Sequence, residues 1–202
     1  MTGRHWLIPA NLVTATCWGT LCLVWLAGAV YNRYRAPAAR KRTTPSWAWL
    51  AGVVAVWLVF EVAPSATWSR LTVHSPWTWT PGLALLLAST AFTLWARLAL
   101  GTMWSSAAVT RETHALRTDG PYAVTRHPIY AGVLGMLAGT ALVNDLGPWV
   151  PVFLFGLVLL EVKIRAEERL LSRVFPRDYE RYRQRVPRLL PDPLRFLGNR
   201  AG

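Results

Sequence analysis

Five runs of apolar residues, separated by polar segments, dominate the pattern along this chain. The runs cover residues 7–30, 47–63, 81–96, 129–144 and 146–160. A helix rises about 1.5 Å per residue, so the first run alone can cross a hydrocarbon core of about 30 Å. The pattern predicts an all-α integral membrane protein with about five transmembrane helices, forming a single membrane domain over residues 1–202.

Local signals refine this picture. The first run is predicted to be a retained helix, because the apolar core of a cleaved signal peptide is shorter. The turn-forming segment 144–148 separates the last two runs and predicts a helical hairpin. Within that hairpin, Ala131, Gly135 and Gly139 recur every fourth residue, a spacing that favours close packing against another membrane helix.

The positive charges predict how the chain is oriented. With the N-terminus outside, 20 of the 22 Lys and Arg residues lie in inner segments, and only Arg4 and Arg70 lie outside. This satisfies the positive-inside rule. We therefore expect a protein of the cytoplasmic (inner) membrane, with the polar segments 97–128 and 161–200 and any active site facing the cytoplasm.

The composition narrows the possible partners. The net charge is +12, but the basic residues flank apolar runs, where membrane lipid head groups rather than nucleic acid are the nearest anions. The 12 tryptophans include several that border the runs, as in the aromatic belts of membrane proteins. The two cysteines and four histidines show no metal-ligand spacing, so we predict no metal site.

The C-terminal tail is predicted to continue as amphipathic helix at the cytoplasmic surface. The apolar side of its first part consists of Leu170, Leu171, Val174 and Phe175. Pro176 interrupts the helix. A second short helix then gathers Tyr179, Tyr182 and Val186 on one side, with arginines around the others. Taken alone, this second helix suits a position on anionic lipid.

The polar segment before the fourth run carries candidate chemistry. Pro128 suits the first turn of the fourth helix, whose N-terminal N–H groups and positive dipole end can receive an anion. Arg126 and His127 stand beside that helix start, and the rings of Tyr122 and Tyr130 can stack on a flat base. This segment is therefore predicted to contact a charged, partly aromatic ligand.

A second polar cluster follows the fifth run. Lys163 and Glu167 share one helix face, and Glu161, Arg165 and Glu168 share another. Both ends of the hairpin meet the same membrane interface, so the loop and this cluster are expected to converge on one pocket. Each residue alone also fits an ordinary interface anchor or a solvated ion pair. The concentration of polar groups at a lipid boundary favours a functional site.

Two motifs resemble the isoprenylcysteine carboxyl methyltransferase family. The first is H-x-L-x-x-x-G-P-Y-x-x-x-R-H-P-x-Y-x-G, from His114 to Gly132. The second is E-E-x-x-L-x-x-x-F-x-x-x-Y-x-x-Y-x-x-x-V-P-R-x-x-P, from Glu167 to Pro191. The resemblance divides the chain into residues 1–100, three transmembrane helices of unmatched sequence, and residues 101–192, the cofactor-binding loop, hairpin and C-terminal helices.

The resemblance implies S-adenosylmethionine as the cofactor. The family holds it without the G-x-G-x-x-G motif, which is absent here. The implied cofactor contacts are His114, Ala115, Leu116, Arg117, Tyr122, His127, Pro128, Ile129, Tyr130 and Glu167. We add Arg126 and Glu168 because they stand directly beside these positions.

Three residues are expected to be catalytic: Glu167, Lys163 and Arg165. Glu167 can steady the positively charged cofactor, and Lys163 or Arg165 can bind an anionic acceptor. In eukaryotic members of the family, the position of Lys163 holds an arginine assigned to the substrate carboxylate. A lysine keeps the charge but loses the bidentate fork. A thiol or amine acceptor would need a base, and His127 and Glu167 are the candidates.

The predicted function is S-adenosylmethionine-dependent methyl transfer to a lipophilic small-molecule or lipidated acceptor, through a carboxylate, thiol or amine. Three alternatives stay open. The chain can be a phospholipid or small-amine N-methyltransferase, an NADPH-dependent membrane reductase of isoprenoids or steroids, or a scaffold without catalytic activity. Binding of S-adenosylhomocysteine or of NADPH discriminates between the methyltransferase and the reductase, and a scaffold binds neither.

Overall fold

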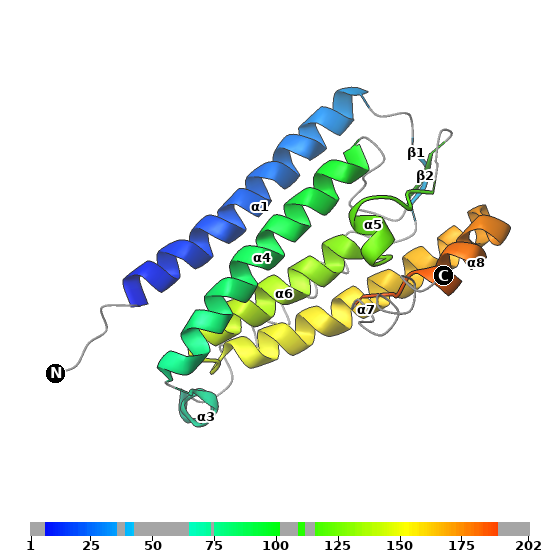
Figure 1. Ribbon diagram of the computed structural model, residues 1–202. Helices are drawn as coiled ribbons and strands as arrows, with labels where there is room; N and C mark the ends of the chain where they lie inside the picture. Colours follow the sequence, from blue (N-terminus) through cyan, green and yellow to red (C-terminus); the bar gives the residue numbers. More distant parts are fainter. Residues whose placement is uncertain are drawn as a thin grey trace, which may run out of the picture.

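Four long helices form the body of the protein. The computed structural model describes residues 7–35, 39–42, 65–73, 75–101, 109–111 and 116–189. Their helices are α1 (Leu7–Arg35), α3 (Ser65–Leu71), α4 (Pro76–Leu100), α5 (Pro121–Val124), α6 (Pro128–Val143), α7 (Trp149–Val174) and α8 (Pro176–Arg185), and the strands are β1 (Ala39–Arg42) and β2 (Val109–Arg111). Helices α1, α4, α6 and α7 lie in that order across the bundle, and α8 packs on the end of α7 (Figure 1).

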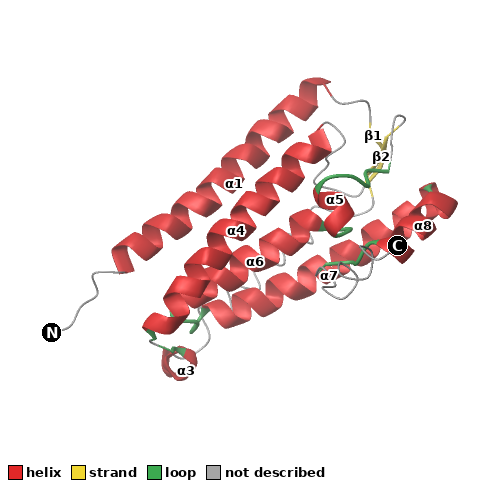
Figure 2. Cartoon of the chain, viewed as in Figure 1, coloured by secondary structure: helices red, strands yellow, loops and turns green. Residues whose placement is uncertain are grey.

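The helical fold predicted from the apolar runs is confirmed, with four of the five runs found in helices (Figure 2). The run at 47–63 lies outside the described residues. Two helical stretches, Asn11–Tyr31 and Trp77–Leu100, are long and apolar enough to cross a membrane, and α6 is a shorter apolar helix. The fifth run and the first part of the tail form one continuous helix, α7, because no helix-breaking residue lies between them. The helix ends at Val174, two residues before Pro176.

A short two-stranded antiparallel sheet accompanies the helices. Strand β1 pairs with β2, with Ala39 opposite Arg111 and Arg42 opposite Val109. Strands of three and four residues are too short to show an alternating pattern, and each partner lies far away in the chain. The pairing places the polar segment after α1 and the polar segment after α4 at the same end of the bundle, as the charge distribution required.

Small residues set the close approach of α4 and α6. A methyl group added at Gly139 of α6 would lie 2.7 Å from the Leu86 backbone nitrogen and 2.9 Å from the Gly82 carbonyl oxygen of α4. The predicted packing role of Gly135 and Gly139 is confirmed, and Gly132 joins them on the face toward α4. The hairpin of α6 and α7 is therefore held against α4 by backbone contact.

The turn between α6 and α7 confirms the predicted hairpin. Asp145 and Leu146 adopt φ values of 60° and 62° there. The segment after α3 holds this turn, because the Val73 N–H donates to the Asp145 carbonyl at 3.0 Å and the Gly147 N–H donates to the Leu71 carbonyl at 3.1 Å. The hairpin thus has a fixed end opposite the predicted site.

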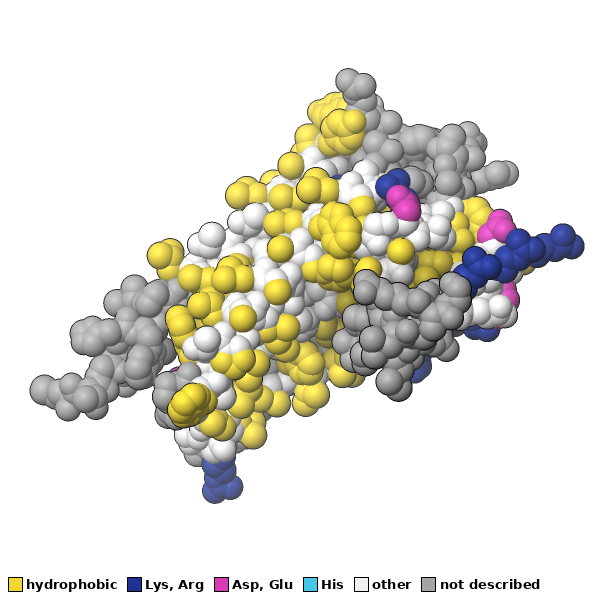
Figure 3. Space-filling view, viewed as in Figure 1, with side chains coloured by type: hydrophobic (Ala, Val, Ile, Leu, Met, Phe, Trp, Pro, Cys, Tyr) yellow, Lys and Arg dark blue, Asp and Glu magenta, His cyan; other side chains and the backbone are white. Residues whose placement is uncertain are grey.

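The exterior of the bundle is largely apolar. Leu23 of α1 is 69% exposed, and Leu98 of α4 is 71% exposed. Figure 3 shows apolar side chains along the length of the visible face, with Lys and Arg gathered mainly at the end that carries α8. Large apolar side chains on the outside and charges at the ends are typical of a protein whose middle contacts lipid.

Substitution of Gly139 tests the helix contact. We expect Gly139→Ala to lower the free energy of unfolding by about 1–3 kcal/mol, because the nearest atoms belong to the α4 backbone and the helices must separate. The matched control is Gly19→Ala in α1, since a methyl group there meets nothing within 4 Å. Unfolding in detergent, followed by tryptophan fluorescence, measures both. Equal stability of the two variants would contradict the proposed contact.

Candidate active site

The loop before α6 directs His127 into the structure. Pro128 is the first residue of α6, and His127 precedes it as the N-cap residue. Proline suits this position because the N–H group of the first residue in a helix has no acceptor within that helix, and proline lacks this group. The His127 carbonyl accepts the Ala131 N–H at 2.9 Å, and the His127 side chain is only 5% exposed. The imidazole is therefore attached to the backbone at a fixed position, at the N-terminal end of α6.

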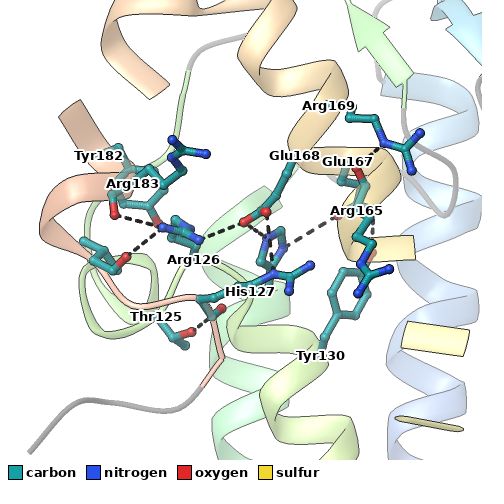
Figure 4. A network of polar contacts seen from close by, with 12 residues as sticks. Thr125, Arg126, His127, Tyr130, Arg165, Glu167, Glu168, Arg169, Tyr182 and Arg183 are labelled. Carbon is teal, nitrogen blue, oxygen red and sulfur yellow. Dashed lines mark hydrogen bonds and ion pairs between the residues drawn. The ribbon is translucent and has the colours of Figure 1, made fainter. Parts of the chain in front are cut away.

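Two adjacent carboxylates of α7 meet this loop from the other side (Figure 4). The Glu168 Oε1 atom lies 2.9 Å from Arg126 Nη2 and 3.3 Å from His127 Nε2. The Glu167 Oε2 atom lies 3.9 Å from His127 Nδ1. The convergence of the loop and the end of the hairpin that the sequence predicted is confirmed, with His127 between the two acids.

The environment of Glu168 keeps it ionised. Burial alone would raise the pKa of its carboxyl group, but this effect is outweighed. The hydrogen bond with His127 and the positive charges of Arg126 and Arg188 hold that pKa at about 2. Glu168 is therefore a carboxylate at neutral pH, with its charge taken up by protein groups.

Glu167 has a different set of neighbours. The Tyr130 hydroxyl donates to its Oε1 atom at 2.5 Å. The Lys163 ammonium lies 5.3 Å from the centre of the Tyr130 ring, at a distance typical of a cation–π contact. Burial lowers the pKa of Lys163, and the nearby charge of Glu167 partly offsets that effect. Glu167 thus faces a hydroxyl group and a half-buried ammonium group.

The side of α8 that carries its tyrosines packs on the protein rather than on lipid. Tyr179, Tyr182 and Val186 are buried and pack with Leu116, Leu171 and Phe175. The Tyr182 hydroxyl donates to the Tyr122 carbonyl at 2.6 Å. The interpretation of α8 as a helix with its apolar face on anionic lipid is wrong in this respect, because that face covers the loop of the site.

The remaining predicted residues are distributed as follows. Tyr122 is buried, and this burial raises the pKa of its hydroxyl. The nearby charge of Glu167 raises the pKa further, so the side chain remains a neutral phenol. Arg117 pairs with Asp119 at 2.7 Å. Pro128 and Ile129 are buried at the start of α6. His114 and Ala115 lie outside the described residues.

Arg165 differs from its expected position. Its side chain is 63% exposed and pairs with Glu161 at 2.7 Å. The pairing follows the helix face predicted from the sequence. Among the described residues, Arg165 makes no hydrogen bond or ion pair with His127, Tyr130 or Glu167.

Arg188 contacts the site although no role was predicted for it. Its Nη1 atom lies 3.0 Å from Glu161 Oε1, and its Nε atom lies 3.5 Å from Glu168 Oε2. The available signal was its place in the second motif, directly after Val186 and Pro187. Its partners could not be inferred, because the path of the chain after α8 is set by tertiary contacts.

Known proteins are similar to this chain over the segment that carries the site. Residues 82–173 match the model of the isoprenylcysteine carboxyl methyltransferase (ICMT) family. The cobalt-zinc-cadmium resistance protein CzcN of Cupriavidus metallidurans is 31% identical over 142 residues, which are 68% of this chain and 63% of that protein. The protein-S-isoprenylcysteine O-methyltransferase of Schizosaccharomyces pombe is 42% identical over 81 residues, which are 39% of this chain and 34% of that protein.

A solved structure has a similar fold. The structure of the eukaryotic intramembrane Ras methyltransferase ICMT without a monobody superimposes with a TM-score of 0.56 at 24% identity, covering 74% of this chain and 54% of that chain. This chain thus spans between about one third and just under two thirds of the length of these relatives. At this identity the structural likeness shows the fold alone.

The matched segment contains α6, both acidic residues of the site and most of α4 and α7. Over residues 82–173, which carry the acidic residues and the histidine of the site, this chain is similar to the isoprenylcysteine carboxyl methyltransferase family.

Proposed function

We propose that this protein is an integral membrane methyltransferase that transfers a methyl group from S-adenosylmethionine to a lipidated or lipophilic acceptor at the cytoplasmic face. The observation that carries the proposal is the meeting of His127, Tyr130 and Glu167 at the polar end of an apolar bundle. These side chains come from the segment that matches the family.

The side chains present suit the cofactor. S-adenosylmethionine carries a sulfonium, an ammonium and a carboxylate group, so it needs both acidic and basic partners. Glu167 can accept from a cationic group, because its side chain is 21% exposed and the hydrogen bond to it comes from the neutral Tyr130 hydroxyl. Glu168 suits this task less, since Arg126, His127 and Arg188 already surround its charge.

The other cofactor contacts follow from position. His127 lies beside Glu167, and Lys163 lies over the Tyr130 ring. Their nitrogen atoms are proposed to contact the cofactor carboxylate or an anionic acceptor. The remaining contacts in the proposal are His114, Ala115, Leu116, Arg117, Tyr122, Pro128 and Ile129, which the family resemblance supplies.

The chain's own contribution to the reaction is mainly positioning. When bound, S-adenosylmethionine supplies an electrophilic methyl group. Glu167 and Tyr130 hold one side of the site, and the buried rings of His127 and Tyr122 exclude water from it. A carboxylate acceptor needs no base, so Lys163 has only to hold it in line. A thiol or amine would require His127 or Glu167 to remove a proton.

The acceptor is proposed to be a carboxylate on a lipidated molecule, as in isoprenylcysteine. The bundle offers a largely apolar exterior beside the site, over which a lipid chain can lie (Figure 3). The exposed arginines of α8, among them Arg177, Arg181 and Arg185, are proposed to face the head groups of the inner leaflet. This orientation follows the positive-inside distribution.

Glu167→Gln tests the central residue. We expect methyl transfer to fall at least about 100-fold, because the amide keeps the size of the side chain but removes the negative charge beside the cofactor. The measurement is transfer of labelled methyl from S-adenosylmethionine to a farnesylated cysteine in reconstituted membranes. The matched control is Glu180→Gln on α8, an exposed residue paired with Arg183, which should keep wild-type activity. Full activity of the Glu167 variant would exclude the assigned role.

His127→Ala tests cofactor binding directly. We expect the Kd for S-adenosylhomocysteine to rise about tenfold, because one buried polar contact beside Glu167 is lost. Isothermal titration calorimetry measures it, with NADPH titrated in parallel. An unchanged Kd would count against this site. NADPH binding by a wild-type protein that ignores S-adenosylhomocysteine would favour the reductase.

The role proposed for Lys163 is tested by measuring the KM for the acceptor. Lys163→Met should raise the KM for a carboxylate acceptor about tenfold and leave the Kd for S-adenosylhomocysteine unchanged, since only the acceptor loses its counter-charge. Burial lowers the pKa of Lys163, so the wild-type KM should rise as the pH increases toward that lowered value and the ammonium loses its proton. Lys163→Arg should remove this pH dependence. Equal pH profiles for both proteins would refute the assignment.

A further inference from the structure

The chain after α8 returns to the loop that begins α6. The Arg126 N–H donates to the Pro187 carbonyl at 2.9 Å, and the His127 N–H donates to the Arg188 carbonyl at 3.2 Å. The Thr125 hydroxyl donates to the same Arg188 carbonyl at 2.9 Å. The backbone N–H groups of Arg126 and His127 are therefore both hydrogen-bonded to the tail that follows α8.

The side chain of Arg188 ties the tail to α7 as well. Its guanidinium group lies between Glu161 and Glu168, which are two turns apart on one side of that helix. The Arg188 side chain is 33% exposed and that of Glu168 is 20% exposed. This pair is more shielded from water than an ordinary surface ion pair, so its geometry is better defined.

The two oxygens of Glu168 have separate partners. Oε1 faces Arg126 and His127 of the loop, and Oε2 faces Arg188 of the tail. A carboxylate group is planar and rigid, so a guanidinium group on one oxygen restricts where the other oxygen points. The direction of the Glu168 contact with the imidazole thus depends on Arg188.

We infer that Arg188 is a positioning residue, which fixes the His127 ring through Glu168 and so directs the His127 Nδ1 atom toward Glu167. The consequence for catalysis rests on the proposed function. Without Arg188, the Glu168 Oε2 atom loses its guanidinium partner, and the carboxylate can turn more freely about its side-chain bonds. The imidazole then samples several orientations, and Glu167 loses a fixed neighbour.

The test compares Arg188→Ala with Arg188→Lys and with Arg185→Ala in the full-length protein. Arg185 is the matched control, because it lies exposed at the end of α8 and forms no ion pair with the residues that the structure describes. The readouts are hydrogen exchange of the Arg126 and His127 amides and the nitrogen NMR signals of the His127 ring.

Arg188→Ala should speed exchange of both amides about tenfold and shift or broaden the ring signals. Arg188→Lys should show a smaller change, because an ammonium group keeps the charge but lacks the fork that spans two carboxylates. Arg185→Ala should match the wild type. Ring signals that stay unchanged in Arg188→Ala would overturn the inference.

A double-mutant cycle shows whether the effect passes through Glu168. In a Glu168→Gln background, Arg188→Ala should change the ring signals little further, and full additivity would overturn the inference. Should Arg188→Ala fail to fold, Glu161→Gln removes only one anchor of the guanidinium group and should produce the same change more weakly.

Ligand binding separates this inference from the proposed function. Arg188→Ala should raise the Kd for S-adenosylhomocysteine about tenfold at an unchanged acceptor KM, and an unchanged Kd would overturn the catalytic part of the inference. A wild-type protein that binds no S-adenosylhomocysteine would overturn the proposed function instead. The exchange rates and ring signals would still decide whether Arg188 positions His127.

Discussion

The ionised carboxylate of Glu168 is the interaction on which the rest of the site depends. Burial opposes its charge, and the groups that stabilise it, Arg126, His127 and Arg188, come from the loop before α6 and from the tail after α8. The carboxylate is therefore stable only when α7, the loop and the tail are assembled. Removing one partner leaves the other buried charges without their counter-charge, which costs more than a surface pair contributes.

Two adjacent acids of one helix serve different ends. Successive residues of a helix point about 100° apart, so Glu167 and Glu168 face different neighbours. Glu168 contacts Arg126, His127 and Arg188, whereas Glu167 faces the Tyr130 hydroxyl and the Lys163 ammonium group. One carboxylate thus belongs to an ion-pair network between elements, and its neighbour is the one that we propose to contact the cofactor.

The helical frame and the convergence of the two polar clusters could both be predicted from the order of residues along the chain. Uninterrupted apolar runs require helices, because a lipid environment leaves backbone groups no other partners. Pro128 marks the start of α6, and the turn at 144–148 marks a hairpin. Both ends of a membrane hairpin must return to the same interface, so His127 and Glu167 could be placed together without coordinates.

Which side chains meet at that interface depends on contacts between segments that are distant in the chain. Arg188 reaches Glu168 because the tail folds back along the loop, and α8 turns its tyrosines onto Tyr122 instead of lipid. Arg165 is satisfied by Glu161 outside the site. The pairing of β1 with β2 was likewise invisible. Local periodicity records which face of an element is apolar, but contacts between distant segments depend on how the chain returns, and no short sequence window contains that information.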